Sequence, residues 1–197
     1  MTTTIAITGG IGSGKSTLCK KLTEKGFKIH SSDEQVAKIY NNPDKKFISY
    51  LSTIGLSTAI TKKKIDKKII SKIIFENKKI RKKLELYVFK IVRKKRSAFT
   101  RQEKQKKTKL IFIDIPLLFE NRLENKFHKV ISIIASKQVR LKRLKKTRKM
   151  TETQFKNITR SQTSDVIRKK KSDYVIYNNS TLKDYNIKIN KLLNKLL

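Results

Sequence analysis

Residues Gly9 to Thr17 read GGIGSGKST, and this stretch decides the fold. It follows a short β-branched run, Ile5 to Thr8, and opens a predicted helix over about Lys15 to Glu24. A strand, a glycine-rich loop and a helix in this order fit the pattern GxxxxGK[ST], whose backbone amides surround phosphate groups. Glycines permit a positive φ and a close approach of the backbone to a ligand. The stretch therefore predicts a phosphate-binding loop, and the alternative is a glycine-rich turn that only resembles one.

The loop assigns a role to each of its polar residues. Lys15 is expected to reach the β- and γ-phosphates of a nucleotide as a point charge, and Ser16 to ligate Mg²⁺. The helix N-terminus adds the positive end of its dipole. With Gly12, Ser13, Gly14 and Thr17, these residues form the expected binding site for a nucleoside triphosphate. The sequence thus predicts a magnesium-dependent nucleotide site.

Two carboxylates follow predicted strands. Asp114 ends LIFIDI, residues Leu110 to Ile115, an apolar run typical of a parallel strand buried on both faces. It is expected to hold Mg²⁺, although it also fits an ordinary strand-end aspartate. Asp33 follows a predicted strand at Phe27 to His30 and is a candidate catalytic base, or else an N-cap of the next helix. Glu120 either assists Asp114 or caps the segment after Pro116.

The remaining pattern indicates an α/β protein. Further strands are expected at Val130 to Ala135 and Tyr174 to Ile176, and a closing amphipathic helix at Leu182 to Leu197. The stretch from about 34 to 109 has helical periodicity and reads as an inserted region. Residues 136–172 are basic and helical, with only Glu152 and Asp165 as acids, and are expected to form a lid. Strands separated by helices predict a parallel sheet with right-handed connections.

Composition limits the class of protein. The chain has 197 residues, with 50 Lys and Arg against 15 Asp and Glu, giving a formal net charge of +35. This excess reflects either residue-usage bias on solvated faces or a polyanion-binding role, and charge alone does not choose between them. No run approaches the length of a membrane span, and the N-terminus leads directly into a strand, so a cytoplasmic protein is expected. Cys19 is expected to be a buried, inert thiol.

Four segments together resemble one enzyme family. They are TGGIGSGKST at Thr8 to Thr17, the aspartate at Asp33, DIPLLFE at Asp114 to Glu120 and SDYVIYNNS at Ser172 to Ser180. In this order and spacing, the chain resembles the dephospho-CoA kinases. These enzymes phosphorylate the ribose 3′-hydroxyl of dephospho-CoA with ATP in the last step of coenzyme A synthesis.

The resemblance implies a fold and a set of partners. The fold is a P-loop kinase-type parallel five-stranded sheet flanked by helices, with an inserted helical substrate region and a helical lid. Within one domain over 1–197, the core is expected at about 1–33, 110–135 and 173–197, the helical region contacting coenzyme A at 34–109 and the lid at 136–172. The implied partners are ATP, Mg²⁺ and dephospho-CoA, with no role for membranes or nucleic acid.

The resemblance also implies site residues. Asp33 takes the position of the catalytic base, and Arg143, Arg148 and Arg168 are expected to meet ATP phosphates from the lid. For the arginines, the alternative is ordinary solvated surface.

Some positions depart from the family pattern. Ser31 to Asp33 read Ser-Ser-Asp where the family usually has Asp-Ala-Asp, and Phe89 and Lys90 replace a His-Pro pair. Thr147 and Lys67 stand where arginines are expected. These differences concern coenzyme A contacts and the lid, because lysine cannot reproduce the bidentate fork of arginine.

Two other functions remain open at this stage. A nucleoside or nucleotide kinase of the same architecture would act on a different acceptor. A nucleotide-regulated protein that binds nucleic acid would suit the charge, but the chain lacks an aromatic RNA-recognition pattern and an NKxD guanine motif.

Overall fold

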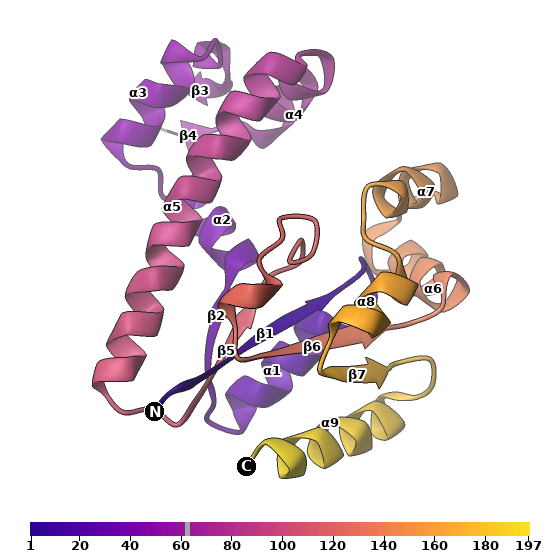
Figure 1. Ribbon diagram of the computed structural model, residues 1–197. Helices are drawn as coiled ribbons and strands as arrows, with labels where there is room; N and C mark the ends of the chain where they lie inside the picture. The colour runs from indigo at the N-terminus through magenta and orange to yellow at the C-terminus, as the bar shows by residue number, and fades with distance from the viewer. Residues whose placement is uncertain (62–63) are drawn as a thin grey trace. The chain divides into compact units, whose positions relative to one another are not determined.

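The computed structural model describes residues 1–61 and 64–197, which form two compact units. Unit 1 comprises Met1–Ser31 and Gln102–Leu197, and unit 2 comprises Ser32–Arg101 (Figure 1). Each unit has its own cluster of buried apolar side chains.

A five-stranded parallel sheet forms the centre of unit 1, as the sequence predicts. The strands are β1 (Thr3–Gly9), β2 (Lys28–Ser31), β5 (Leu110–Asp114), β6 (Lys129–Ile134) and β7 (Tyr174–Tyr177). The strand order is β2-β5-β1-β6-β7, so each neighbour is reached by a crossover (Figure 1). The central strands β1, β5 and β6 are almost wholly buried, as expected for a parallel sheet that is covered on both faces.

Two helices cover one face of this sheet. Helices α1 (Lys15–Glu24) and α9 (Leu182–Leu196) share an apolar cluster with side chains of β1, β5, β6 and β7. Three helices of the predicted lid follow β6: α6 (Lys137–Arg148), α7 (Glu152–Arg160) and α8 (Asp165–Lys171), the last of which packs beside β6. A short 3-10 turn, η2 (Glu124–Lys126), precedes β6.

Unit 2 is mostly helical, but one element departs from the prediction. Its helices are α2 (Ser32–Asn41), α3 (Lys45–Thr53), α4 (Lys67–Glu76) and the first part of α5 (Lys78–Gln105), with a 3-10 turn η1 (Ser57–Ala59). Between them, β3 (Ile60–Thr61) pairs antiparallel with β4 (Lys64–Ile65). Ile60 lies opposite Ile65, a β-branched pair suited to strands. Lys62 and Lys63 of the expected helical stretch lie outside the described residues.

The register of the sheet brings the predicted site residues of unit 1 to one edge. Asp114, the last residue of β5, is the register partner of Ile7 in β1 and of Ser31 in β2. Gly9, where the glycine-rich loop begins, pairs with Ile133 of β6. The carboxyl ends of neighbouring parallel strands therefore open on one crevice, where ligands of α/β sheets bind.

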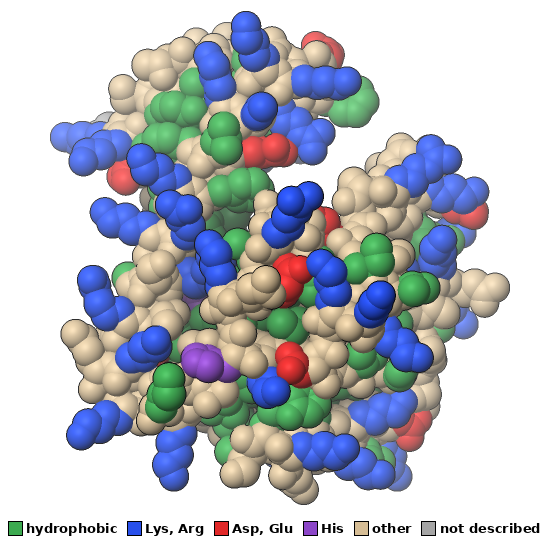
Figure 2. All heavy atoms as spheres, viewed as in Figure 1, with side chains coloured by type: hydrophobic (Ala, Val, Ile, Leu, Met, Phe, Trp, Pro, Cys, Tyr) green, Lys and Arg blue, Asp and Glu red, His purple; other side chains and the backbone are tan. Residues whose placement is uncertain are grey.

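The side chains of the surface are strongly basic. Figure 2 shows Lys and Arg spread over the visible face in small groups, with acidic and apolar side chains between them. Cys19 is only partly buried against the core of unit 1, so the prediction of a buried thiol is wrong. It lies on α1 one turn from the fully buried Leu22, at the border of the apolar face. Within the described ranges, no helix is long and apolar enough to cross a membrane.

Candidate active site

The loop between β1 and α1 has the backbone geometry of a phosphate-binding loop. Gly12 and Gly14 have φ angles of 75° and 106°, which side-chain-bearing residues rarely adopt. Gly14 also lacks room for a side chain, because a Cβ there would collide with the amide nitrogen of Asn178. The amide of Ser13 donates to the carbonyl of Gly10 at 3.1 Å and closes a tight turn. Glycine is therefore required at these positions for both conformation and space.

Helix α1 begins without a side-chain cap. Its N-cap is Gly14, which has no side chain to accept a hydrogen bond, and its first turn contains no acid. The other α-helices with an assigned N-cap are capped by a side-chain oxygen, and Asn77 does the same for α5. The capping residues are Asp44, Asp66, Asn77, Ser136, Thr151, Ser164 and Thr181. The first amides of α1 and its dipole are thus left for another acceptor, and an anionic ligand suits them.

Two side chains from the C-terminal part of the chain fix the loop by hydrogen bonds to its carbonyls. The amide nitrogen of Asn178, just after β7, donates to the carbonyl of Ser13 at 2.8 Å. The phenol of Tyr185 in α9 donates to the carbonyl of Gly14 at 3.1 Å. Burial raises the pKa of Tyr185 well above its usual range, so the phenol remains a donor. These bonds use the carbonyls of Ser13 and Gly14, and they leave the first amides of α1 without a side-chain cap.

Arg143 of α6 connects the lid to this support. One terminal nitrogen donates to the side-chain oxygen of Asn178 at 3.2 Å, while the other is buried and has no partner among the described residues. Arg148, at the end of the same helix, is exposed. Of the three predicted lid arginines, Arg143 is thus the one tied to a residue that supports the loop.

Arg168 lies in a different environment. It is 1% exposed, and its terminal nitrogens contact Asp165 at 3.0 Å and Glu120 at 3.3 Å. Asp165 also pairs with Arg140, at 3.4 Å. Burial lowers the pKa of Arg140, while Asp165 opposes the shift and Arg168 adds to it. Two buried arginines and two partly exposed carboxylates therefore form a cluster with balanced charge, in which Arg168 is committed to two ion pairs.

Glu120 has a role that the sequence did not suggest. Its carboxylate accepts the backbone amide of Thr163 at 2.6 Å in addition to Arg168. It thereby fastens the connection between α7 and α8 to the segment after β5. Neither expectation, assistance to Asp114 or capping after Pro116, describes these contacts.

The other predicted site residues lie in the first turns of α1 and α2 and at the end of β5. Lys15 and Thr17 are half-buried and Ser16 is exposed in the first turn of α1, while Asp114 is 6% exposed at the end of β5. Asp33 is in unit 2, in the first turn of α2, because that helix begins at Ser32 rather than at Glu34. Its carboxylate is exposed and has no partner among the described residues, so no capping bond occupies it.

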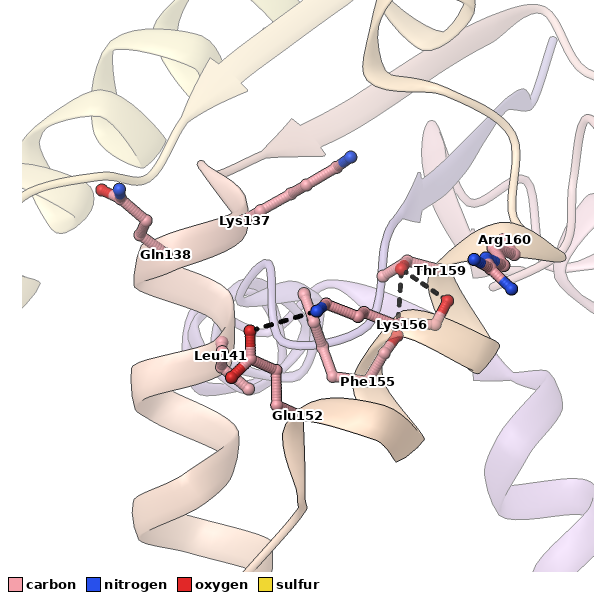
Figure 3. Close-up of a pocket in the computed structure, with 8 residues that line it drawn as sticks. All are labelled: Lys137, Gln138, Leu141, Glu152, Phe155, Lys156, Thr159 and Arg160. Carbon is pink, nitrogen blue, oxygen red and sulfur yellow. Dashed lines mark hydrogen bonds and ion pairs between the residues drawn. The ribbon is translucent and has the colours of Figure 1, made fainter.

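A separate pocket of about 310 Å³ lies between α6 and α7 (Figure 3). Leu141 and Phe155 line it, together with Lys137, Lys156 and Arg160. Figure 3 shows the ion pair between Glu152 and Lys156, which also line the pocket. None of its lining residues belongs to the glycine-rich loop, so this pocket is distinct from the predicted phosphate site.

Sequence reasoning missed several residues that contact the loop. Asn178 was within a recognised motif, SDYVIYNNS, and that motif was its only signal. Tyr185 has the spacing of an ordinary core residue of α9, and Arg140 lies among many basic residues. Gln162 accepts the Ile11 amide at 3.0 Å and has no sequence signal, because a single glutamine between helices is common. These contacts depend on distant elements meeting.

Comparisons with known proteins point to one enzyme family. A family model described as dephospho-CoA kinase matches residues 3–184. A curated dephospho-CoA kinase of Fusobacterium nucleatum is 37% identical over 188 residues, which cover 95% of each chain. The solved structure of a dephospho-CoA kinase from Campylobacter jejuni has a TM-score of 0.75 and 31% identity, covering 100% of this chain and 98% of the other.

A more distant structure shares the fold alone. Shikimate kinase from Acinetobacter baumannii has a TM-score of 0.54 at 14% identity, covering 100% of this chain and 93% of the other. The predicted P-loop kinase-type fold is therefore confirmed at two levels of similarity.

The buried ion cluster generates a stability prediction. Asp165→Asn leaves Arg140 and Arg168 with one carboxylate between them, and we expect a loss of about 2 kcal/mol of unfolding free energy, reduced from the fully buried case because Asp165 is partly exposed. Urea unfolding followed by circular dichroism measures it. Glu152→Gln, which breaks an exposed pair, is the matched control and should cost less than about 0.5 kcal/mol. Equal losses in the two variants would contradict the cluster's role.

Proposed function

The chain belongs to the dephospho-CoA kinase family, and from that premise we propose that it transfers the γ-phosphoryl group of ATP to the ribose 3′-hydroxyl of dephospho-CoA. The products are CoA and ADP. The observation that carries the proposal is the start of α1, where Gly14 leaves the first helical amides uncapped. Asn178 and Tyr185 fix the loop before these amides by hydrogen bonds to its carbonyls. Uncapped amides on a fixed backbone are a favourable site for a polyphosphate.

The donor phosphates are proposed to bind along this loop. The amides at the start of α1 and the Lys15 ammonium face the β- and γ-phosphates, with Gly12, Ser13, Gly14 and Thr17 lining them. The amide of Ser13 is committed to Gly10, so Ser13 is expected to contribute through its buried hydroxyl, which has no partner among the described residues. Binding at fixed amides needs little rearrangement of the protein.

The residues present fit a magnesium ion. Ser16 supplies a hydroxyl and Asp114 a carboxylate, the oxygen ligands that Mg²⁺ prefers, and Mg²⁺ sites at nucleotides use few protein ligands. Asp114 lies at the end of β5, opposite Ile7 in β1, two residues before the loop begins. When bound, Mg²⁺ would neutralise charge on the β- and γ-phosphates.

The lid arginines are proposed to stabilise the transferring phosphoryl group. Arg143 carries a buried terminal nitrogen without a partner among the described residues and suits a phosphate oxygen. Arg148 is exposed, and a contact from it requires the end of α6 to approach the nucleotide. Arg168 is proposed to contribute through its Nε, which has no partner among the described residues, or by holding the lid in place through its two ion pairs.

Asp33 is the proposed catalytic base. Strand β2 ends at Ser31 opposite Asp114, and two residues of chain span at most about 7 Å, so the backbone of Asp33 stays close to the end of β2. Its exposed carboxylate is free to hydrogen-bond the ribose hydroxyl and accept its proton. As the hydroxyl oxygen bonds to the γ-phosphorus, the bond from that phosphorus to the bridging oxygen of ADP breaks.

We also propose a cytoplasmic location and no role for nucleic acid. The basic residues are dispersed on the surface shown in Figure 2, which suits solvated lysines better than a nucleic-acid track. The acceptor is proposed to contact the helical region at about 34–109, and the segment 136–172 to act as a lid over the donor.

An assay of ADP release with different acceptors tests the proposed activity. Dephospho-CoA should support turnover, whereas AMP, adenosine and pantetheine derivatives should support at least tenfold less. Comparable rates with adenosine or AMP would instead favour a nucleoside or nucleotide kinase.

The base assignment makes a specific prediction. Asp33→Asn should lower kcat about 10²- to 10⁴-fold with ATP affinity retained, because the amide cannot accept the proton. Steady-state kinetics and ATP titration measure the two effects. Glu34→Gln is the matched control, since it removes a neighbouring carboxylate from the same helical turn. Near-normal turnover in Asp33→Asn would contradict the assignment of Asp33 as the catalytic base.

A second kinetic prediction concerns Lys15 of the phosphate loop. Lys15→Ala should lower kcat/KM for ATP by about 10²- to 10³-fold, since it removes a fixed charge beside the transferring phosphoryl group. Lys20→Ala, an exposed lysine of the same helix, should leave these kinetics unchanged. If both variants matched the unmodified enzyme, the phosphate-loop interpretation would be rejected.

A further inference from the structure

We propose that Gln162 is a positioning residue of the phosphate loop, which sets the orientation of the Gly10–Ile11 peptide unit from the lid. The proposal rests on the proposed ATP-dependent function for its kinetic consequence, but the contact itself is measurable without substrate. The side-chain oxygen of Gln162 accepts the Ile11 amide at 3.0 Å. The two residues are 151 positions apart in the chain.

One peptide plane connects this bond to the rest of the loop. The Ile11 amide and the Gly10 carbonyl belong to the same planar unit. Gln162 binds the amide side of that unit, and the Ser13 amide binds the carbonyl side at 3.1 Å. Gln162 therefore orients the carbonyl on which the Ser13 turn closes, and this turn leads into the amides at the start of α1.

The backbone of Gln162 is held on both sides. Its own amide donates to Thr159 at the end of α7, and the next amide, at Thr163, donates to the Glu120 carboxylate at 2.6 Å. Helix α7 is anchored through Phe155, which is 4% exposed and lines the pocket between α6 and α7 in Figure 3. The backbone of Gln162 is thus fixed, and its side chain extends from there to the loop.

Arg140 packs closely against the loop at Gly10, next to the hydrogen bond from Ile11 to Gln162. Its guanidinium lies beside Gly10, where a Cβ would collide with it, and 5.7 Å above the ring of Phe155. The pair with Asp165 holds it there. The Gly10–Ile11 unit is therefore enclosed by a cation and a carbonyl oxygen from the lid, and the carbonyl oxygen is its hydrogen-bond acceptor.

The remaining atoms of Gln162 favour a role in the loop. Its side-chain nitrogen has no partner among the described residues, so the hydrogen bond to Ile11 is the only one the side chain makes there. A side chain that only stabilised the lid would be expected to bind lid atoms. The single bond crosses instead to the proposed nucleotide site.

Gln162→Met provides the test, because methionine keeps the length and shape of glutamine and removes the acceptor. In protein labelled with ¹⁵N-isoleucine and free of nucleotide, the Ile11 amide should exchange with solvent about fivefold faster in this variant, the effect of losing one hydrogen bond. The amides of Ile7 and Ile113, in buried strands, should not change. Gln162→Glu retains an acceptor oxygen and should preserve the protection of Ile11.

Kinetics give the second measurement. The KM for ATP should rise about fivefold in Gln162→Met, while kcat and the KM for dephospho-CoA change less than twofold. Gln138→Met is the matched control, because Gln138 is an exposed glutamine of α6 and makes no hydrogen bond to the loop within the described residues. It should alter neither the exchange of Ile11 nor the kinetics.

Unchanged exchange of Ile11 in Gln162→Met would overturn the proposal. So would an equal effect of the two glutamine variants on the KM for ATP. Because exchange is measured on the protein alone, it also separates failure of this proposal from failure of the proposed enzymatic function.

Discussion

The uncapped start of α1 is the constraint on which the rest of the site depends. Most helices of this protein satisfy their first amides with a side chain, but Gly14 has none to offer. The open amides are a favourable anion site only if the loop before them is rigid, since a mobile loop would lose entropy on binding. Asn178 and Tyr185 supply that rigidity by binding loop carbonyls from two other elements. The glycines make these close contacts possible.

The lid is joined to the core by charges as well as apolar packing. In one cluster each charge has an opposite partner, and its arginines are buried while its carboxylates are partly exposed; the members are Arg140, Arg168, Asp165 and Glu120. Such a cluster adds little net stability over apolar packing, but removing one member leaves a buried charge. It therefore favours one arrangement of the segment after α7 over others. The same arrangement holds Gln162 next to Ile11.

Much of the fold was predictable from the sequence because its signals are local. Apolar β-branched runs located the five strands of unit 1 to within one or two residues, and the glycines marked the start of α1. The antiparallel pairing of β3 with β4 was missed, since lysine and isoleucine runs fit either a helix or short strands. The start of α2 at Ser32 was placed two residues late, because serine and aspartate are the residue types that usually cap a helix.

The sequence by itself determined the phosphate loop, the parallel sheet and the family, because motif spacing and periodicity are properties of short segments. The tertiary structure alone decided which side chains support the loop. Asn178, Tyr185 and Gln162 lie more than 150 residues from their loop partners, and no local pattern predicts which part of the loop each one contacts. It also placed Arg168 inside an ion cluster rather than on a solvated surface. Hydrogen bonds and ion pairs between distant elements form only when the chain folds, so the periodicity of the sequence does not predict them.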